Sequence, residues 1–483
     1  MSNISKEIQS GSFFLFIGRY SNIIVQIIIT GILARLISPE EFGVVAIAMV
    51  FILFFNGLSD FGFGPAVVQQ KNIRKLDIDS IFWVTVIQGL FLCSLMVLTK
   101  RFIVDFYNNE ELNKVLFYLS FAIFFSSVIT VPRSLNRRHK KFKFIGWSSV
   151  VVNIVTGATA IILALFYDYG VYALVVKVIL DSFVMFIYNM KVANYIPSFQ
   201  FSISPIKKVF RYSSYQFLYN FLHYFSRNID NLFIGKYLGS AALGFYDKSY
   251  KLMIMPVQNL TNVISPVLHP VLAKYQDDKN IIAKNYLHLV KLLSIIGFPL
   301  SVFLFFSAEE IIMIIYGSDW EQSVIPFQFL ALSVGFQMVT SSARGVFQAL
   351  GSTKLLFTST LFTLILIGLS LYFGLSLYSS LNIVSLLVSA SYALTFVYVM
   401  QIVFINLLNV KYKDIWKCIK SAFYISVVLI LIFKVNFIVL DSLLLSLLFK
   451  TSLFIIIYIL TSLLLKEQFI ITVLKKIKSN LKN

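Results

Sequence analysis

Charged residues are scarce in this sequence. Only 13% of its 483 residues are Asp, Glu, Lys or Arg, whereas an average soluble domain carries about 25%. Hydrophobic residues instead make up 58% of the chain. An excess of this size cannot be buried in one water-soluble core, so the composition argues against a soluble protein and indicates one that lies in a lipid bilayer.

Cysteine and histidine are also rare. The two cysteines are Cys93, in an apolar run, and Cys418, in a basic one, and neither has the spacing partner that a metal site or disulfide needs. The four histidines are scattered and form no zinc motif. Nucleotide-binding loops and nucleophile constellations are missing as well. We therefore expect no enzyme activity, no bound metal and no cofactor.

Long apolar runs fill the chain instead. A helix needs about 20 mostly apolar residues to cross a bilayer, and runs of that kind recur from end to end. The first run is too long for the hydrophobic part of a signal peptide, so we expect it to be retained. The sequence predicts an all-α polytopic membrane protein of about fourteen transmembrane helices. The expected spans are 11–34, 42–68, 80–99, 115–132, 145–166, 170–190, 212–235, 243–273, 285–306, 322–350, 355–374, 383–408, 415–433 and 442–465.

The basic residues are distributed unevenly between the loops. The net charge of +19 would suit a nucleic-acid-binding protein, but most lysines and arginines fall in the even-numbered loops and at both ends. The opposite loops are acidic. This is the positive-inside pattern, and it places both termini in the cytoplasm with no nucleic-acid partner. The densest run, 133–143, is expected to act as a stop signal beside anionic lipid headgroups.

An internal repeat appears at an offset of 201 residues. Gly43 corresponds to Gly244 and Pro65 to Pro266, and polar positions of the first span recur in the seventh. Six spans separate the copies, so both enter the membrane in the same direction and form a parallel repeat. We expect two six-helix lobes plus two C-terminal helices. The expected boundaries are 1–200, 201–410 and 411–483.

Polar residues follow one face of the first and seventh spans, because their spacings of three, four and seven return to the same side of a helix. A charge at mid-bilayer costs roughly 2.5–3.5 kcal/mol, so these faces should line a watery cavity between the lobes. Further charges lie inside other spans. The candidate substrate-contacting residues are Arg19, Asn22, Gln26, Lys177, Asn220, His223, Arg227, Asp230, Asn231, Lys248 and Arg344.

A cavity with several basic side chains suits an anion, and phosphate is the natural candidate because guanidinium binds its oxygens bidentately. Two pairs, Arg227 with Asp230 and Lys177 with Asp181, stand one helical turn apart. Each pair could instead be a structural ion pair that holds helices together. The carboxylates that could bind a coupling proton or sodium ion are Asp60, Asp181 and Asp230.

Four segments resemble a known family. They are 34–43 (ARLISPEEFG), 58–69 (LSDFGFGPAVVQ), 226–239 (SRNIDNLFIGKYLG) and 347–354 (FQALGSTK). They are similar to segments of the Wzx-type polysaccharide flippases, in the branch that includes colanic-acid and teichuronic-acid exporters. These belong to the multidrug/oligosaccharidyl-lipid/polysaccharide exporter (MOP) superfamily.

The resemblance implies a monomeric protein of a bacterial inner membrane. It would export an undecaprenyl-pyrophosphate-linked oligosaccharide from the cytoplasmic to the outer leaflet by alternating access. Its partners would be membrane lipids and the polymerase or glycosyltransferase machinery. In this hypothesis the pyrophosphate pairs with Arg19, Arg227 or Lys177. Two alternatives stay open: a cation-coupled drug exporter of the same superfamily, and a membrane polysaccharide polymerase or ligase. The short, acidic external loops count against the second.

Overall fold

The computed structural model describes residues 3–59, 63–69, 73–199, 202, 204–435, 440–467 and 470–472. Within that part of the chain, the side chains of 3–12, 66, 69, 204–223, 226, 262–267, 269–270 and 353 are left out of the description. Every regular element in the described ranges is a helix, which confirms the all-α fold class. The chain divides into two compact units, Met1–Gly244 and Phe245–Asn483.

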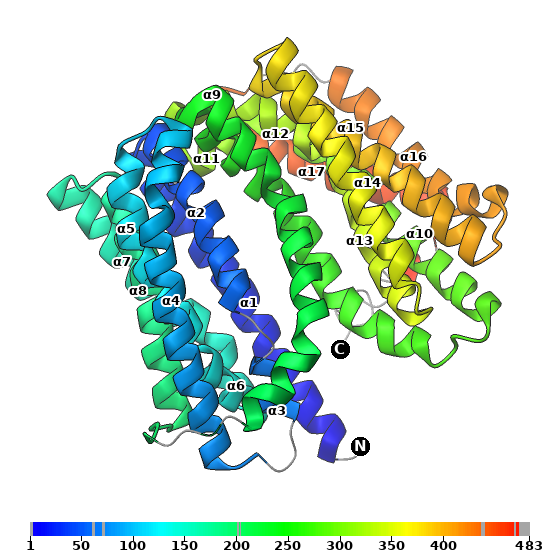
Figure 1. The fold of residues 1–483 in the computed structure, drawn as a ribbon. Coiled ribbons are helices and arrows are strands. Elements are labelled where there is room, and N and C mark those ends of the chain that lie inside the picture. The colour runs from blue at the N-terminus through cyan, green and yellow to red at the C-terminus, as the bar shows by residue number, and fades with distance from the viewer. Residues whose placement is uncertain are drawn as a thin grey trace, which may run out of the picture. The chain divides into compact units, whose positions relative to one another are not determined.

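In the described part of the first unit the chain forms eight helices and then enters a ninth; they are labelled in Figure 1. Helix α1 packs along α7, α4 packs along α5, and α8 lies against both α5 and α7. The short helices α3 and α6 contact each other and follow α2 and α5, respectively, in the chain. The helices are α1 (Asn3–Leu36), α2 (Pro39–Ser59), α3 (Phe63–Gln69), α4 (Lys75–Tyr107), α5 (Glu111–Val128), α6 (Thr130–Arg138), α7 (Phe142–Tyr167) and α8 (Val171–Ala193).

The second unit is built in a related way. Helix α10 packs on α13 and α16, α14 packs on α15, and α17 contacts α11 and α16. Its elements are α10 (Lys279–Phe306), α11 (Ala308–Ile315), a 3₁₀ helix (Ser318–Ser323), α12 (Val324–Ala331), α13 (Val334–Ala349), α14 (Thr353–Tyr372), α15 (Leu381–Met400), α16 (Tyr412–Val435) and α17 (Leu443–Leu464). Short π-helical segments, Phe373–Leu377 and Gln401–Leu407, extend α14 and α15.

Helix α9 (Ser204–Ala273) carries the chain from the first unit into the second. It is interrupted at Gly239, whose φ of 87° and ψ of 173° are not helical. A positive φ of this kind is easily adopted only by glycine. The break falls between the two spans expected at 212–235 and 243–273.

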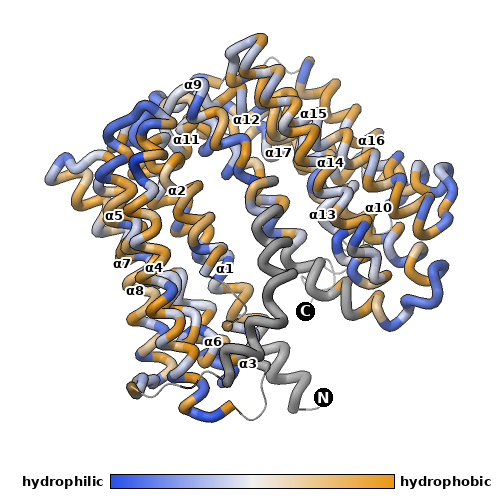
Figure 2. The backbone as a smooth tube through the Cα atoms, viewed as in Figure 1, coloured by the Kyte–Doolittle hydropathy of each residue, from blue (hydrophilic) through white to orange (hydrophobic). Residues whose placement is uncertain are grey.

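Each expected span coincides with helical structure where the chain is described. Among the described residues, eleven helices are long and apolar enough to cross a membrane, and a twelfth span is formed if Ser318–Ala331 and Val334–Ala349, bent by 53°, count together. The two spans expected in α9 are not among these, so the count of fourteen is not confirmed. Hydrophobic residues dominate the middle of the helices in each unit, whereas hydrophilic residues gather at helix ends and loops (Figure 2).

The same helix contacts recur in the two units. The contacts of α4 with α5 and α6 in the first unit correspond to those of α10 with α12 and α13 in the second, and α7 with α8 corresponds to α14 with α15. Likewise α8 contacts α5 and α6, as α15 contacts α12 and α13. These repeated neighbours support the parallel repeat. The expected boundaries at 200 and 410 stay a prediction, because the compact units meet at Gly244.

A close contact inside the first unit shows the repeat at the level of single residues. A Cβ on Gly43 would lie 1.7 Å from the carbonyl oxygen of Ser240, and a Cβ on Gly244 would lie 2.0 Å from that of Pro39. Pro39 and Ser240 are themselves 201 residues apart, as are Gly43 and Gly244. The two contacts are therefore counterparts of each other, and each requires glycine because the backbones touch.

Candidate functional site

A polar cavity of about 750 Å³ lies within the first unit. Its walls come from α1, α2, α3, α5, α6, α7 and α8. Four of the residues expected to contact substrate or a coupling ion line it: Asn22, Gln26, Lys177 and Asp181. The surrounding helices are long and apolar, and polar groups inside a membrane are costly. A polar cavity of this size is therefore a candidate binding site.

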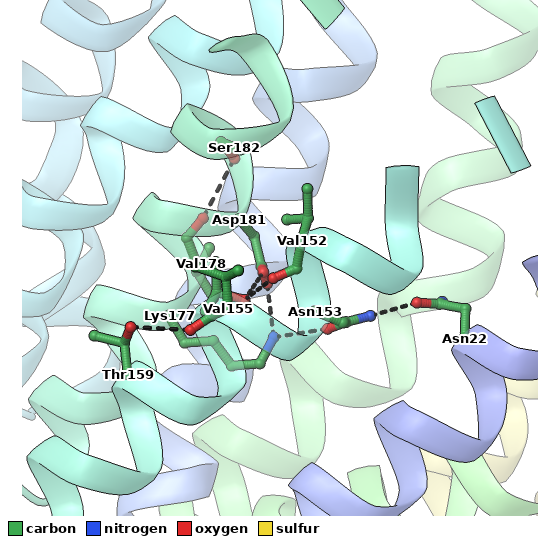
Figure 3. A network of polar contacts seen from close by, with 10 residues as sticks. Asn22, Val152, Asn153, Val155, Thr159, Lys177, Val178, Asp181 and Ser182 are labelled. Atoms are coloured by element: carbon green, nitrogen blue, oxygen red, sulfur yellow. Dashed lines mark hydrogen bonds and ion pairs between the residues drawn. The ribbon is translucent and has the colours of Figure 1, made fainter. Parts of the chain in front are cut away.

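A chain of polar contacts crosses one wall of the cavity (Figure 3). The Lys177 ammonium lies 2.7 Å from Asp181 Oδ2 and donates to Asn153 Oδ1 at 3.1 Å. Asn153 Nδ2 in turn donates to Asn22 Oδ1 at 2.7 Å. Since an ammonium can only donate, the Asn153 amide must turn its oxygen toward Lys177, and this leaves its nitrogen for Asn22. The chain thus ties α1, α7 and α8 together.

The ion pair of this network is only partly shielded from solvent. The exposed fraction is 17% for the Lys177 side chain and 34% for Asp181. Thr156 donates a hydrogen bond to Asp181 Oδ1, so both carboxylate oxygens already have a donor. A proton or sodium ion at Asp181 would have to compete with these donors. Within the described ranges, no group of three or more His, Cys, Asp or Glu side chains could hold a metal ion.

The remaining described candidates of the first unit are not among the residues that line the cavity. Arg19 is half-buried on α1 and does not line the cavity. Arg227 is exposed on α9, and no ion pair joins it to Asp230 among the described side chains. Asp230 is 4% exposed and accepts the backbone N–H of Asn231 at 2.9 Å.

Three candidates fall where the structure gives no side chain. Asp60 lies outside the described residues, and Asn220 and His223 belong to the stretch of α9 whose side chains are not described. The cavity expected between the lobes involves these residues and stays a prediction.

Two candidates belong to the second unit. Lys248 is 5% exposed, and its ammonium lies 5.9 Å from the ring centres of both Tyr316 and Trp320. At that distance the rings stabilise the cation. Arg344 is exposed on α13.

Several cavity residues were missed by sequence reasoning. Arg133 and Arg137 line the cavity from α6, although the basic run that contains them was interpreted as a stop signal. Asn56 and Asn153 are single amides in apolar helices, which by itself indicates only helix packing. The sequence signal that could have found these two residues is a polar side chain in the middle of an expected span.

The family described as "Polysaccharide biosynthesis protein" matches residues 32–325. The chain is 24% identical over 374 residues to the teichuronic acid biosynthesis protein TuaB of Bacillus subtilis (strain 168), covering 77% of each protein. It is 26% identical over 312 residues to the lipopolysaccharide biosynthesis protein WzxC of Escherichia coli (strain K12), covering 63% of this chain and 62% of WzxC. The succinoglycan biosynthesis transport protein ExoT of Rhizobium meliloti (strain 1021) is 23% identical over 327 residues, covering 68% of this chain and 66% of ExoT.

Solved structures show the same fold. The inward closed conformation of the lipid II flippase MurJ has a TM-score of 0.74 and 16% sequence identity, covering 95% of this chain and all of MurJ. An inward-facing multidrug resistance MATE family transporter of the MOP superfamily has a TM-score of 0.58 and 14% identity, covering 80% of this chain and 95% of the transporter. These likenesses confirm the fold, and the family match confirms the resemblance seen in the sequence. The chain belongs to the family described as "Polysaccharide biosynthesis protein" and is a multi-pass membrane protein that shares its fold with MurJ and with that MATE family transporter.

Proposed function

We propose that this protein is a flippase that moves an undecaprenyl-pyrophosphate-linked oligosaccharide from the cytoplasmic to the outer leaflet by alternating access. The observation that carries the proposal is the 750 Å³ polar cavity, with Lys177 and Asp181 in its wall, inside a unit of apolar helices of membrane length.

The physical problem of such transport is the polar head. A hydroxyl that enters hydrocarbon without a hydrogen-bond partner costs about 2–7 kcal/mol, so an oligosaccharide cannot cross lipid unaided. A cavity lined with amides, hydroxyls and charges supplies those partners. Its volume lies within the range of about 300–1,000 Å³ typical of ligand pockets. The polyprenyl tail needs no such cavity, because it can stay in the lipid.

The names of similar proteins agree with this proposal. TuaB, WzxC and ExoT are named for the biosynthesis of teichuronic acid, lipopolysaccharide and succinoglycan, and ExoT is named a transport protein. MurJ is named a flippase of lipid II.

The location and the driving force are part of the proposal. The distribution of basic residues between the loops supports a bacterial inner membrane with both termini in the cytoplasm. A membrane potential that is negative inside then favours outward movement of an anionic head by about 2.3 kcal/mol per charge per 100 mV. Coupling to a proton or sodium ion is a further proposal, with Asp181 as a described candidate. Polymerase and glycosyltransferase partners would supply the cargo and remove it.

Deletion of the gene tests the function. We expect lipid-linked saccharide to accumulate in the inner leaflet of the deletion strain, and the wild-type gene to restore export. Accumulated lipid, extracted and analysed by mass spectrometry, would identify the cargo. If the lipid pool is unchanged while efflux of a cationic dye such as ethidium falls, the drug-exporter alternative is correct instead.

A further inference from the structure

Helix α16, in the second unit, has a buried face and an exposed face. The buried face contains Ile425 and Leu429, which belong to one apolar cluster with Val302 of α10. Residues of the opposite face recur after three or four positions, so they follow one side of the helix. This exposed stripe consists of Lys413, Trp416, Lys417, Lys420, Phe423 and Tyr424.

The composition of the exposed stripe changes along the helix axis. Its lysines occupy the first turns, its aromatic residues Phe423 and Tyr424 follow, and the exposed side chains beyond them are Ile430 and Leu431. From Lys413 to Tyr424 the helix rises about 16 Å, whereas one leaflet with its headgroups is about 20 Å thick. A phospholipid has the same order of parts over this depth, with a charged headgroup followed by acyl chains.

Trp416 marks the boundary between the basic and the apolar part of the stripe. Its side chain is 52% exposed, and its ring centre lies 5.9 Å from that of Phe423. Tyr412, one turn earlier, is 63% exposed. Exposed Trp and Tyr side chains concentrate at the membrane interface, because one end of each ring system is apolar and the other can bind water. The aromatic residues therefore place the lysines at headgroup level.

The charge of these first turns is positive. Residues 411–420 contain four lysines and one aspartate. Asp414 Oδ1 lies 2.9 Å from the Lys417 ammonium, so this one carboxylate is already engaged. Lys413 and Lys420 make no hydrogen bond or ion pair with any residue in the part of the chain that the structure describes. Their long apolar stems can reach the headgroups of the membrane while they lie along the helix.

Membrane topology does not require this arrangement. The positive-inside rule concerns the number of basic residues beside a span and not the side of the helix that they occupy. In the basic run after α6, Arg138 and Lys141 donate to backbone carbonyls of Val67 and Val192 instead. A soluble acidic partner would match the lysines of α16 but not the apolar residues that continue the same face. An anionic lipid matches both.

We propose that the exposed stripe of α16 binds an anionic phospholipid of the cytoplasmic leaflet. Lys413 and Lys420 attract the headgroup, Trp416 lies beside the glycerol region, and the acyl chains run along Phe423 and Tyr424. None of the stripe residues lines the polar cavity of the first unit. The inference therefore concerns a lipid other than the cargo and does not depend on the proposed function.

Fluorescence of the full-length protein in phosphatidylcholine nanodiscs tests the site. The nanodiscs contain a small fraction of brominated phosphatidylglycerol or, in parallel, of brominated phosphatidylcholine, because bromine quenches nearby indole rings. The signal of Trp416 is the difference between the wild type and Trp416→Phe. We expect brominated phosphatidylglycerol to quench this signal at a lower fraction than brominated phosphatidylcholine does.

Lys413→Gln with Lys420→Gln removes the two lysines that have no ion-pair partner and keeps the contact of Lys417 with Asp414. This double variant should lose about fivefold or more of the preference for phosphatidylglycerol, because one basic residue near an anionic surface contributes about a factor of five. Lys413→Arg with Lys420→Arg keeps both charges and should keep the preference. Circular dichroism and size-exclusion profiles show that the variants are folded.

The matched control is Lys274→Gln with Lys284→Gln. Both lysines are exposed and belong to the same compact unit, so the change in net charge is identical. The control should quench like the wild type. An equal loss of preference in both glutamine variants would overturn the proposal, because general surface charge would then explain it. Equal quenching of wild-type Trp416 by the two brominated lipids would also overturn it and leave the lysines with a topological role alone.

Discussion

The charges of Lys177 and Asp181 are partly buried, so the contribution of this pair to stability depends on both members. If one partner is removed, the other charge stays partly buried and loses its hydrogen bonds to that partner. If both are removed, no unpaired charge remains. We predict that Lys177→Met lowers the free energy of unfolding by about 1–3 kcal/mol. The double change Lys177→Met with Asp181→Asn should cost less. Thermal unfolding of the purified protein in detergent measures both, and Lys191→Met is the exposed control. A double variant less stable than the single one would contradict the interpretation.

Glu41 joins the starts of two helices. Its Oε2 atom accepts from the Ser38 backbone N–H at 3.0 Å and from the Ser38 hydroxyl at 2.8 Å, and its Oε1 atom accepts from the Val171 N–H at 2.9 Å. A glutamine has only one oxygen and cannot serve both sides. Glu41→Gln should therefore lower stability by about 1–2 kcal/mol. The exposed neighbour change Glu40→Gln should have little effect in the same thermal measurement.

Between elements, the contact of α2 with the second half of α9 depends on two glycines. A Cβ at Gly43 or Gly244 would overlap a backbone carbonyl, and the backbone can move only if the helices separate. We predict that Gly43→Ala and Gly244→Ala each cost about 1–3 kcal/mol, as overpacking does. The two losses should be similar because the contacts are counterparts in the repeat.

Gly57 is the matched control for these changes. It also lies in α2, but a Cβ there would meet nothing within 4 Å. Gly57→Ala should leave stability unchanged or raise it by up to about 1 kcal/mol, because alanine favours the helix. Detergent-solubilised variants compared by thermal unfolding would decide the point. Equal losses at Gly57 and Gly43 would mean that the close contact does not carry the effect.

For the whole molecule, the orientation in the membrane can be measured. With Cys93 and Cys418 replaced by serine, single cysteines are introduced as His139→Cys, in the basic run, and Tyr169→Cys, in the turn between α7 and α8. Both positions are exposed. An impermeant maleimide should label Tyr169→Cys in right-side-out vesicles and His139→Cys in inside-out vesicles. The reverse labelling would place the termini outside.

The fold could be predicted in large part because its causes are local. Apolar runs long enough to cross a bilayer specify helices wherever they occur, and the repeat follows from residues that recur at one offset. The break at Gly239 lies where the sequence separates two spans. The number of spans is harder to predict from the sequence, because α9 mixes polar and apolar residues along its length.

The site could be predicted only in part. Lys177, Asp181 and Asn22 stood out because a polar group inside an apolar span is costly and therefore informative. Arg133 and Arg137 did not stand out, since a basic run beside a span already has a topological explanation. Their approach to the cavity depends on how α6 packs against α3 and α8.

The sequence by itself determined that this protein spans a membrane, that its halves repeat, and which family it resembles, because hydropathy, charge and short motifs act along the chain. Only the tertiary structure decided which polar groups meet. Asn22, Asn153 and Lys177 are far apart in sequence and come together because α1, α7 and α8 pack side by side. The same packing turns Arg137 toward an open polar space while it fastens Arg138 to Val67.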